Sequence, residues 1–595
     1  MAIKKVSAMQ FGATKVYTQV SGVGRWVVVA LVLTLAACGG SGRGNDGSVS
    51  SGSHSSVAEP PSSASSSSAS SISSVSVSSD SSSSSVLSNS SSSFSLLPDS
   101  VQITGTVSYD YVPVSKTAGL DYAAAVAKAV RLARVNLVNQ VGSVIATSQT
   151  DESGRYTLQA PTNTEVKVQV EALSFADAAA QWEVRVEDNT AGDALYVLEG
   201  QLRTSGAVNS RRDLHAASGW TGSGYTEPRA AAPFAIMDTA YQSIQKLVDV
   251  DANLALPPSV FRWSVNNSGA SGDLPAGDIG TSFYNGEAVY ILGQEDSDTD
   301  EYDAHVVAHE WGHFLEFQVG RRADSIGGSH QGTDKLDMRV AYSEGFANAI
   351  AGYVLADPEY RDTSGVGQRF GSGFDINRKN VSNPGWYSES SIQSIFYHLA
   401  ESGAFAQIYG VLSDSLYVAN SAFMTIFSFA DIMQTRYPSV FLRLDDLMDE
   451  QRIDSRDQYG AGETNNGDTE DVLPLYIDVV ADGSIVTVCS TQENGTDNKL
   501  GVHAFLKTTA FTSGRYQLNV KNNGDRAEAT DPDVMVQRGG QLWRGTSAMV
   551  DQEVVDLNLQ SGSTYVISVY DYNTHSGVQQ ADYQPACFDV SLTPQ

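Results

Sequence analysis

The stretch "VVAHEWGHFLEFQ", residues 306–318, contains a His-Glu-x-x-His pattern within an otherwise apolar run. Positions i and i+4 share one face of an α-helix, so we expect His309 and His313 to present their imidazoles to one metal ion. Glu310 directly follows the first histidine, where its carboxylate can take a proton from an attacking water. A helix that buries nearly all its faces does not normally bury such groups without partners, so the stretch predicts a metal-binding helix.

The third metal ligand is expected on a neighbouring helix. Two imidazoles and one carboxylate leave a fourth position open on Zn²⁺, which is typical of a catalytic site. Glu344 lies in "AYSEGFANAIAGY", a helical pattern whose small residues allow close approach to the first helix. Asn348, one turn further on, is predicted to accept a hydrogen bond from the far nitrogen of a ligating imidazole. The intervening residues 320–340 lack helical periodicity and are predicted to form a loop. The loop holds four residues that could replace Glu344 as a ligand: Asp324, His330, Asp334 and Asp337.

Together these features resemble the gluzincin metallopeptidases, the thermolysin-like clan. "SFYNGEAVYILG" (282–293) resembles that clan's substrate-pairing edge strand, and "DAHVVAHEWGH" (303–313) resembles its zinc helix. "SEGFANAIAG" resembles the helix that carries the glutamate ligand, although its spacing from the zinc helix is longer than in thermolysin. The resemblance implies a mainly α catalytic domain with a small edge-strand sheet, a Zn²⁺ cofactor and a peptide or protein substrate.

The same resemblance implies a residue that stabilises the oxyanion. "WYSESSIQSIFYHLA" (386–400) resembles the clan's helix whose leading residue donates a hydrogen bond to the oxyanion, and Tyr387 is the matching position. A phenol there can stabilise the tetrahedral intermediate of amide hydrolysis. Tyr397 and His398 remain alternatives for this role.

The 595-residue chain is long enough for several domains. Alternating apolar and polar runs predict a β-sandwich on each side of the helical region. In the first, "TSQTDESGRYTLQAP" (147–161) resembles the turn and strand of carboxypeptidase-regulatory-like and Cna-B-like modules. In the last, the order "GRYQLNV" (514–520), "DPDVMVQRGG" (531–540) and "VVDLNLQSGSTYVISVYDY" (554–572) resembles the bacterial pre-peptidase C-terminal domain. The expected order is a lipoprotein signal peptide (1–37), a serine-rich disordered tether (38–100), a small β-sandwich (101–200), a zinc metallopeptidase domain (201–470) and a C-terminal β-sandwich (471–595).

The N-terminus predicts export to a bacterial cell envelope. A short apolar run ends in "LAAC" (35–38), which resembles a lipobox and makes Cys38 the predicted lipidation site. Because Gly39 rather than an aspartate follows, the resemblance favours an outer-membrane lipoprotein, periplasmic or surface-exposed. The formal net charge of −31 without a basic block argues against nucleic acid as a partner.

Two further expectations concern disulfide bonding and calcium. Cys489 and Cys587 are the cysteines left after Cys38, and an oxidising compartment favours a disulfide between them. "EDSDTDEYD" (295–303) clusters acids before the zinc helix. Two interpretations of this acidic loop stay open: a solvated surface loop, or a Ca²⁺ site whose oxygen ligands are Asp296, Asp298 and Asp300.

The sequence therefore predicts a lipid-anchored, zinc-dependent endopeptidase that hydrolyses peptide bonds with metal-activated water. The alternative from another class is a surface adhesion or polymer-binding lipoprotein whose central domain is a degenerate peptidase-like scaffold. A zinc hydrolase acting on a non-peptide bond is separated from a peptidase only by the resemblance.

Overall fold

The computed structural model describes residues 99–115, 119–321, 324–524, 529–575 and 585–595. The predicted signal peptide, the lipidation candidate Cys38 and the serine tether up to residue 98 lie outside the described residues. Within the described ranges, no helix combines the length and the apolar character needed to cross a membrane.

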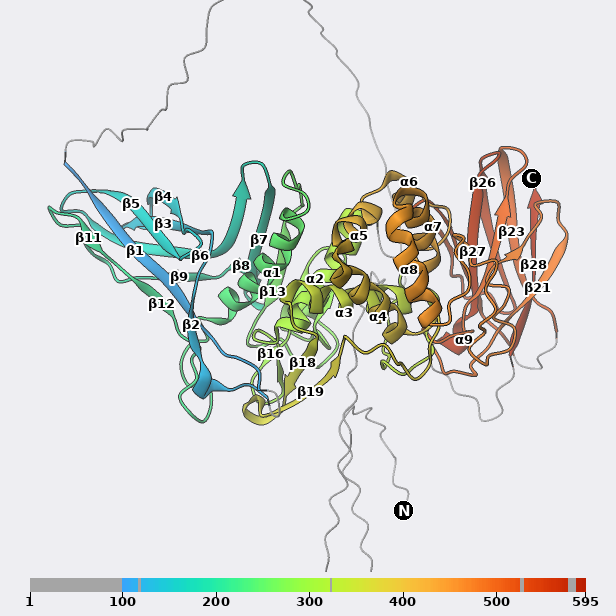
Figure 1. Ribbon diagram of the computed structural model, residues 1–595, viewed down its shortest axis with the longest axis horizontal. Helices are drawn as coiled ribbons and strands as arrows, with labels where there is room; N and C mark the ends of the chain where they lie inside the picture. The colour runs from blue at the N-terminus through green and yellow to red at the C-terminus, as the bar shows by residue number, and fades with distance from the viewer. Residues whose placement is uncertain (1–98, 116–118, 322–323, 525–528, 576–584) are drawn as a thin grey trace, which may run out of the picture. The chain divides into compact units, whose positions relative to one another are not determined.

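The first sheet is built around β1 (Ser100–Tyr111), which alternates buried and partly exposed residues along its length. This period of two places one face of the strand against the core. β1 pairs antiparallel with β5 (Arg155–Pro161) and parallel with β12 (Leu214–Ala216). A second sheet contains β3 (Ala133–Asn139), β4 (Val144–Gln149), β6 (Glu165–Asp177) and β7 (Gln181–Asp188). Figure 1 colours these strands from blue to teal.

The second sheet continues beyond the domain boundary expected at residue 200. β7 pairs in parallel with β13 (Ser259–Trp263), which pairs with β15 (Val289–Ile291). The short strand β14 (Phe283–Tyr284) then ends the order β14-β15-β13-β7-β6-β3-β4. Main-chain hydrogen bonds between β7 and β13 therefore join the two regions into one sheet. Alternation within a strand shows which face is buried but does not show which strand is its neighbour.

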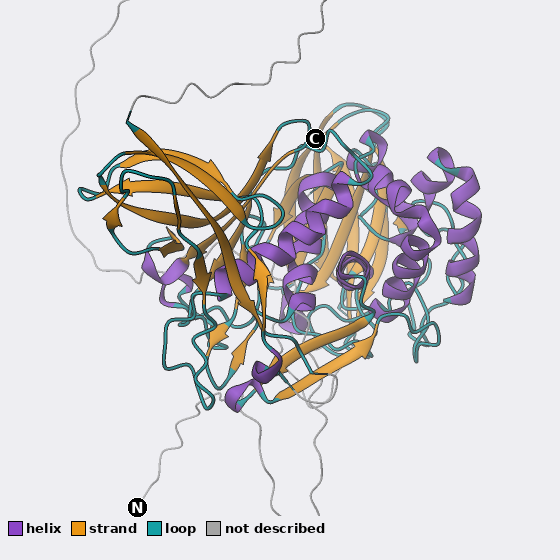
Figure 2. Ribbon diagram, turned by 60° about the vertical axis from the view of Figure 1, so that its left-hand side comes forward, coloured by secondary structure: helices purple, strands orange, loops and turns teal. Residues whose placement is uncertain are grey.

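Eight α-helices lie in the described part of residues 232–450, where Figure 2 shows them in purple. Helix α2 packs against α3, α3 against α4, and α7 against α8. The eight are α1 (Ala232–Val248), α2 (Ala304–Leu315), α3 (Met338–Leu355), α4 (Glu389–Leu399), α5 (Phe405–Leu412), α6 (Ser415–Val418), α7 (Ile426–Arg436) and α8 (Pro438–Glu450).

A four-stranded sheet is formed by residues that precede α2 and residues that follow α3. Its order is β16 (Gly293–Gln294), β17 (Asp298–Thr299), β18 (Glu359–Ser364) and β19 (Phe370–Asp375). β17 and β18 are joined by one pairing, Asp298 with Ser364, whereas β18 and β19 form a full antiparallel hairpin. Residues just before α2 and just after α3 therefore meet in this sheet.

The last region is a sandwich of two sheets with its own core. One sheet has the order β20 (Ile477–Asp478), β22 (Ala504–Thr509), β27 (Thr564–Asp571), β24 (Pro532–Arg538) and β25 (Gln541–Gly545). The other has the order β21 (Ile485–Ser490), β28 (Ala586–Pro594), β23 (Gly514–Asn522) and β26 (Gln552–Leu559). The predicted disulfide is confirmed: Cys489 on β21 is bonded to Cys587, its direct partner on β28. The chain is thus multidomain, with several sheets as well as a helical region.

Candidate metal centre

The His-Glu-x-x-His stretch forms the helix α2, as the sequence predicts. His309 and His313 are buried on one face of it, and their Nε2 atoms lie 3.1 Å apart. Helix α3 brings Glu344 to the same place, with Oε2 at 3.3 Å from His309 Nε2 and 3.5 Å from His313 Nε2. The structure therefore gathers the three residues that the sequence nominated as metal ligands, with their ligand atoms all within 4.8 Å of one another.

Two glycines let the three helices approach this closely. A Cβ at Gly312 on α2 would lie 3.0 Å from Cα of Ala347 on α3. A Cβ at Gly345 on α3 would lie 2.5 Å from the carbonyl oxygen of Glu389 on α4. A larger residue at either position would push the helices apart and separate the side chains that meet between them.

The far nitrogen of His309 is held by Asn348. His309 Nδ1 lies 2.8 Å from Asn348 Oδ1, and Asn348 Nδ2 donates to Glu389 Oε1 at 2.7 Å. Because the Glu389 carboxylate accepts from the amide nitrogen, the amide oxygen faces His309 and accepts from its Nδ1–H. The structure thus places Asn348 where the sequence predicted it, and leaves His309 Nε2 with its lone pair toward Glu344.

His313 is held by a similar chain of hydrogen bonds. Its Nδ1 lies 3.1 Å from Ser343 Oγ, which itself donates to Glu316 Oε2 at 2.6 Å. Since the hydroxyl hydrogen is used on Glu316, the oxygen of Ser343 accepts from His313 Nδ1–H. The lone pair of His313 Nε2 therefore also points toward Glu344.

This donor set fits a zinc ion. Both carboxylate oxygens of Glu344 are buried, and neither has a hydrogen-bond partner among the described residues. Two imidazole lone pairs and a carboxylate repel one another unless a cation joins them. Two neutral imidazole nitrogens and one carboxylate are the ligands of a catalytic zinc site. His309, His313 and Glu344 would hold such an ion.

Glu310 lies beside this cluster and against the edge strand. Burial raises the pKa of Glu310 well above its ordinary value, and the charge of Glu344 adds to the rise. His313 and the backbone N–H of Tyr284, in β14, oppose the rise. Glu310 Oε2 is buried and has no hydrogen-bond partner among the described residues. Oε2 of Glu310 is therefore available to a group that enters beside the cluster.

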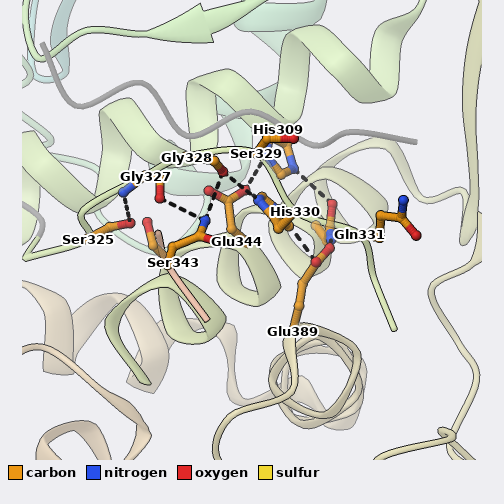
Figure 3. A network of polar contacts seen from close by, with 12 residues as sticks. His309, Ser325, Gly327, Gly328, Ser329, His330, Gln331, Ser343, Glu344 and Glu389 are labelled. Atoms are coloured by element: carbon orange, nitrogen blue, oxygen red, sulfur yellow. Dashed lines mark hydrogen bonds and ion pairs between the residues drawn. The ribbon is translucent and has the colours of Figure 1, made fainter. Parts of the chain in front are cut away.

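His330, in the described part of the loop between α2 and α3, reaches the cluster. Figure 3 shows it between Glu344 and Glu389, with Nε2 at 3.8 Å from Glu344 Oε2 and 3.4 Å from Glu389 Oε2. Its Nδ1 lies 3.0 Å from the carbonyl oxygen of Gly328, to which it donates. Burial lowers the pKa of His330, but Glu344 and Glu389 raise it overall. The described part of the loop thus brings a buried imidazole to the site.

The three aspartates considered as substitute ligands have other partners. Asp324 forms an ion pair with Arg321 at 2.7 Å, and Asp337 pairs with Arg339 at 2.8 Å. Asp334 accepts from a backbone N–H of its own loop and lies 3.4 Å from a lysine. Glu344 is accordingly the carboxylate that the structure brings to the two histidines.

The hydroxyl of Tyr387 is engaged outside the histidine–glutamate cluster. Its single O–H faces two acceptors, the carbonyl oxygen of Pro384 at 3.2 Å and Asn465 Oδ1 at 3.1 Å. The sequence reasoning placed Tyr387 at the head of a helix, but α4 begins two residues later and has Ser388 as its N-cap. The leading residue that faces the cluster is therefore Glu389, which binds both Asn348 and His330.

The alternatives to Tyr387 are also engaged elsewhere. The ring of Tyr397 packs near Gly352 of α3 and against His398. His398 Nε2 lies 3.2 Å from the carbonyl oxygen of Asn377. Tyr397 and His398 thus have other partners in the structure.

A second group of carboxylates lies before α2. The structure brings together Asp298, Asp300 and Asp362, with their ligand atoms within 4.8 Å of one another. Asp296, the other residue of the predicted calcium site, instead accepts from the backbone N–H of Gly367 through Oδ1. The predicted set is thus corrected by one residue, because Asp362 arrives from β18, far along the chain.

Comparison with known proteins gives a partial match. No curated protein matches the chain. A solved pre-peptidase C-terminal domain of a Bacillus anthracis collagenase is 9% identical, with a TM-score of 0.15, covering 20% of this chain and 93% of that one. The lysozyme inhibitor PliG of Aeromonas hydrophila is 15% identical, with a TM-score of 0.13, covering 20% and 96%. Residues 260–396 match the model of the mycolysin C-terminal domain, a stretch that begins in β13, ends in α4 and includes α2 and α3. Over these residues the chain is similar to that family, and the similarity suggests a metallopeptidase-related protein.

Proposed function

We propose that the protein is a zinc-dependent endopeptidase whose metal is held by His309, His313 and Glu344. The observation that carries the proposal is the convergence of two imidazole lone pairs on a buried carboxylate, with both far nitrogens tied to neighbours. Burying three electron-rich groups against one another is unfavourable unless a cation binds between them, so packing alone does not account for this arrangement. Zn²⁺ bound there would act as a Lewis acid that acidifies water and polarises a carbonyl oxygen.

Glu310 and His330 supply the remaining chemistry in this proposal. Water adds to the amide carbon while Glu310 takes its proton, and Glu310 then delivers that proton to the nitrogen as the C–N bond breaks. His330, whose Nδ1–H is held by the carbonyl oxygen of Gly328 and whose Nε2 has no hydrogen-bond partner among the described residues, donates through Nε2–H toward the oxygen on which negative charge develops. His330 takes the part that the sequence gave to Tyr387.

The edge strand β14 favours an extended peptide as substrate. Within the described ranges β14 ends its sheet and pairs with β15 alone, so its other edge makes no strand pairing. The backbone of Tyr284 on this strand lies against Glu310. A peptide added to this edge would run past the proposed general base, and main-chain pairing of this kind does not require a chain end. This arrangement supports internal cleavage.

Replacing Glu310 by glutamine tests the proposal. We expect Glu310→Gln to retain about one zinc per chain by elemental analysis, because the three ligands are unchanged, and to lose hydrolysis of a broad peptide library. Glu287→Gln, an exposed glutamate beside β15, is the matched control and should keep both properties. Retained turnover in Glu310→Gln, or wild-type protein free of zinc after purification with zinc supplied, contradicts the proposal. Loss of cleavage with a zinc chelator and its return with added zinc complete the test.

Export and anchoring form a separate part of the proposal. We propose that the chain is lipidated at Cys38 and displayed from the cell envelope on its serine tether. The support is the sequence of residues 1–100. Cys38→Ser should release the protein from the membrane fraction into the soluble one, and an unchanged membrane fraction would refute the anchor.

A further inference from the structure

The carboxylates before α2 form a buried acidic group with little compensation. Asp300 is 3% exposed, and Asp298 on β17 and Asp362 on β18 are partly buried. Oδ1 of Asp298 and Oδ1 of Asp300 are both buried without a hydrogen-bond partner among the described residues. Asp300 receives one hydrogen bond, from Ser282 Oγ to its Oδ2. An unpartnered carboxylate oxygen inside a group of other carboxylates is costly unless a cation balances it.

A fourth acid adjoins the group. Asp303, which is fully buried, immediately precedes α2 and accepts through Oδ2 from the backbone N–H and the hydroxyl of Thr363, next to Asp362 on β18. Its second oxygen, Oδ1, is buried and has no partner in the described part of the chain. Burial raises the pKa of Asp303 well above its ordinary value, and the nearby charge of Asp362 raises it further. Asp303 therefore places a further buried carboxylate beside the group.

Neighbouring cations are used elsewhere. Arg229 binds the carboxylate of Glu301, which lies between two members of the group in sequence. Arg361, the neighbour of Asp362, pairs with Glu359 at 3.1 Å. In the described ranges, no lysine or arginine forms an ion pair with Asp298, Asp300 or Asp362. The negative charge of these three carboxylates must therefore be neutralised by a bound cation or by protonation.

We propose that Asp298, Asp300 and Asp362 form a Ca²⁺ site. Oxygen-only ligands favour a hard cation over zinc, which prefers nitrogen and sulfur. Three clustered carboxylates, with unpartnered oxygens on Asp298 and Asp300, match the oxygen ligands and flexible geometry of Ca²⁺, whereas Mg²⁺ keeps several waters and rarely occupies an all-protein cage. The ion would be separate from the histidine–glutamate cluster.

The ion would fasten the β18–β19 hairpin to the segment that leads into α2. β17 and β18 share a single strand pair, and the segments are otherwise joined by bonds from Gly365, Thr363 and Gly367 to the residues around β17, so an ion between the carboxylates would add to these contacts. The hairpin carries Tyr360, whose ring lies 5.4 Å from the ring of His305 and 6.2 Å from that of His309 on α2. Calcium would therefore stabilise the packing behind a proposed zinc ligand and raise the unfolding temperature of the protein.

Equilibrium dialysis of the purified full chain against CaCl₂ tests the site, with Asp300→Asn, Asp362→Asn and the control Asp296→Asn. Asp296 is exposed and lies outside the group, and an asparagine there can still accept from Gly367. We expect the wild type and Asp296→Asn to bind calcium saturably with similar affinity, and the other two variants to lose one bound calcium per chain or to bind it at least tenfold more weakly. Equal calcium binding in all four proteins, or no saturable binding in the wild type, overturns the proposal.

Thermal unfolding gives a second readout that holds even if Asp300→Asn fails to fold. The unfolding temperature of the wild type should rise with calcium concentration, as expected for a ligand that binds only the folded state. That rise should be absent in Asp362→Asn and unchanged in Asp296→Asn. An equal rise with MgCl₂ overturns the assignment of calcium, and an equal calcium-dependent rise in Asp362→Asn overturns the site itself.

Discussion

Asn348 offers the sharpest test of how the metal centre is held together. Its amide bridges two helices, since Oδ1 accepts from His309 Nδ1 at 2.8 Å and Nδ2 donates to Glu389 Oε1 at 2.7 Å. Leucine has a similar branched shape but can make neither bond. Asn348→Leu would therefore leave the Nδ1–H of His309 and one oxygen of Glu389 buried without partners.

The size of the effect follows from these two bonds. Each polar group left buried and unpaired costs about 1–3 kcal/mol, so the unfolding free energy should fall by about 2–6 kcal/mol. Freeing the ring of His309 also removes the bond that fixes its tautomer, and losses of this kind lower metal affinity by about 10–100-fold. That range corresponds to about 1.4–2.8 kcal/mol of zinc binding free energy.

Zinc competition with a chromogenic chelator measures the affinity, and chemical denaturation measures the stability. Asn377→Leu is the control, because Asn377 is exposed and its contacts with Asp375 and His398 are made by its backbone. Circular dichroism before the titration separates a folded protein with weak zinc binding from an unfolded one. If folded Asn348→Leu bound zinc as tightly as the wild type, Asn348 would have no part in orienting the ligand.

Three further outcomes are expected. Replacing Cys489 and Cys587 together by serine should lower the unfolding free energy by about 4–5 kcal/mol, because the disulfide closes a loop with a sequence separation of 98 and so restricts the unfolded chain. Chemical denaturation of the wild type and the variant measures the difference, and a change below about 1 kcal/mol would contradict this expectation. Burial and the charge of Asp298 raise the pKa of Asp362 to about 8, so without calcium the folded state holds one more proton than the unfolded state between about pH 4 and 8. The unfolding temperature of the wild type should therefore fall as the pH rises through this window, relative to that of Asp362→Asn. Parallel pH profiles of the two proteins would refute the assignment of this pH dependence to Asp362. Tyr387→Phe should change kcat on a peptide by less than about threefold, whereas His330→Asn should lower it by about 100-fold with zinc retained; the reverse order would restore the sequence-based assignment.

The fold was predictable to the extent that each element carries its own pattern. Apolar periodicity indicated α2 and α3, and alternation indicated the strands of both β-rich regions. The pairing of β7 with β13 was not predictable, because it joins segments separated by many residues. Side-chain alternation is the same for a strand at the edge of a sheet and for one that continues into the next region.

In the candidate site, too, the residues on one helix could be predicted from the sequence, whereas those placed by tertiary packing could not. His309, Glu310 and His313 lie on one helix, and Asn348 follows Glu344 by one turn, so helical geometry alone orders them. The positions of His330 in the loop and of Glu389 at the start of α4 could be found only from the tertiary structure.

His330 lies in a stretch without periodicity, and its position between two glutamates follows from the packing of α3 against α4. Asp362 joins the acidic group only because the β18–β19 hairpin returns to β17. A buried histidine or aspartate in a non-helical segment carries no local pattern that names its partner. Such residues are found instead by looking in the structure for buried carboxylate oxygens that have no hydrogen-bond partner. In the described part of this chain, the oxygens of Glu344 and Oδ1 of Asp300 are of this kind, and His330 and Asp362 lie beside them.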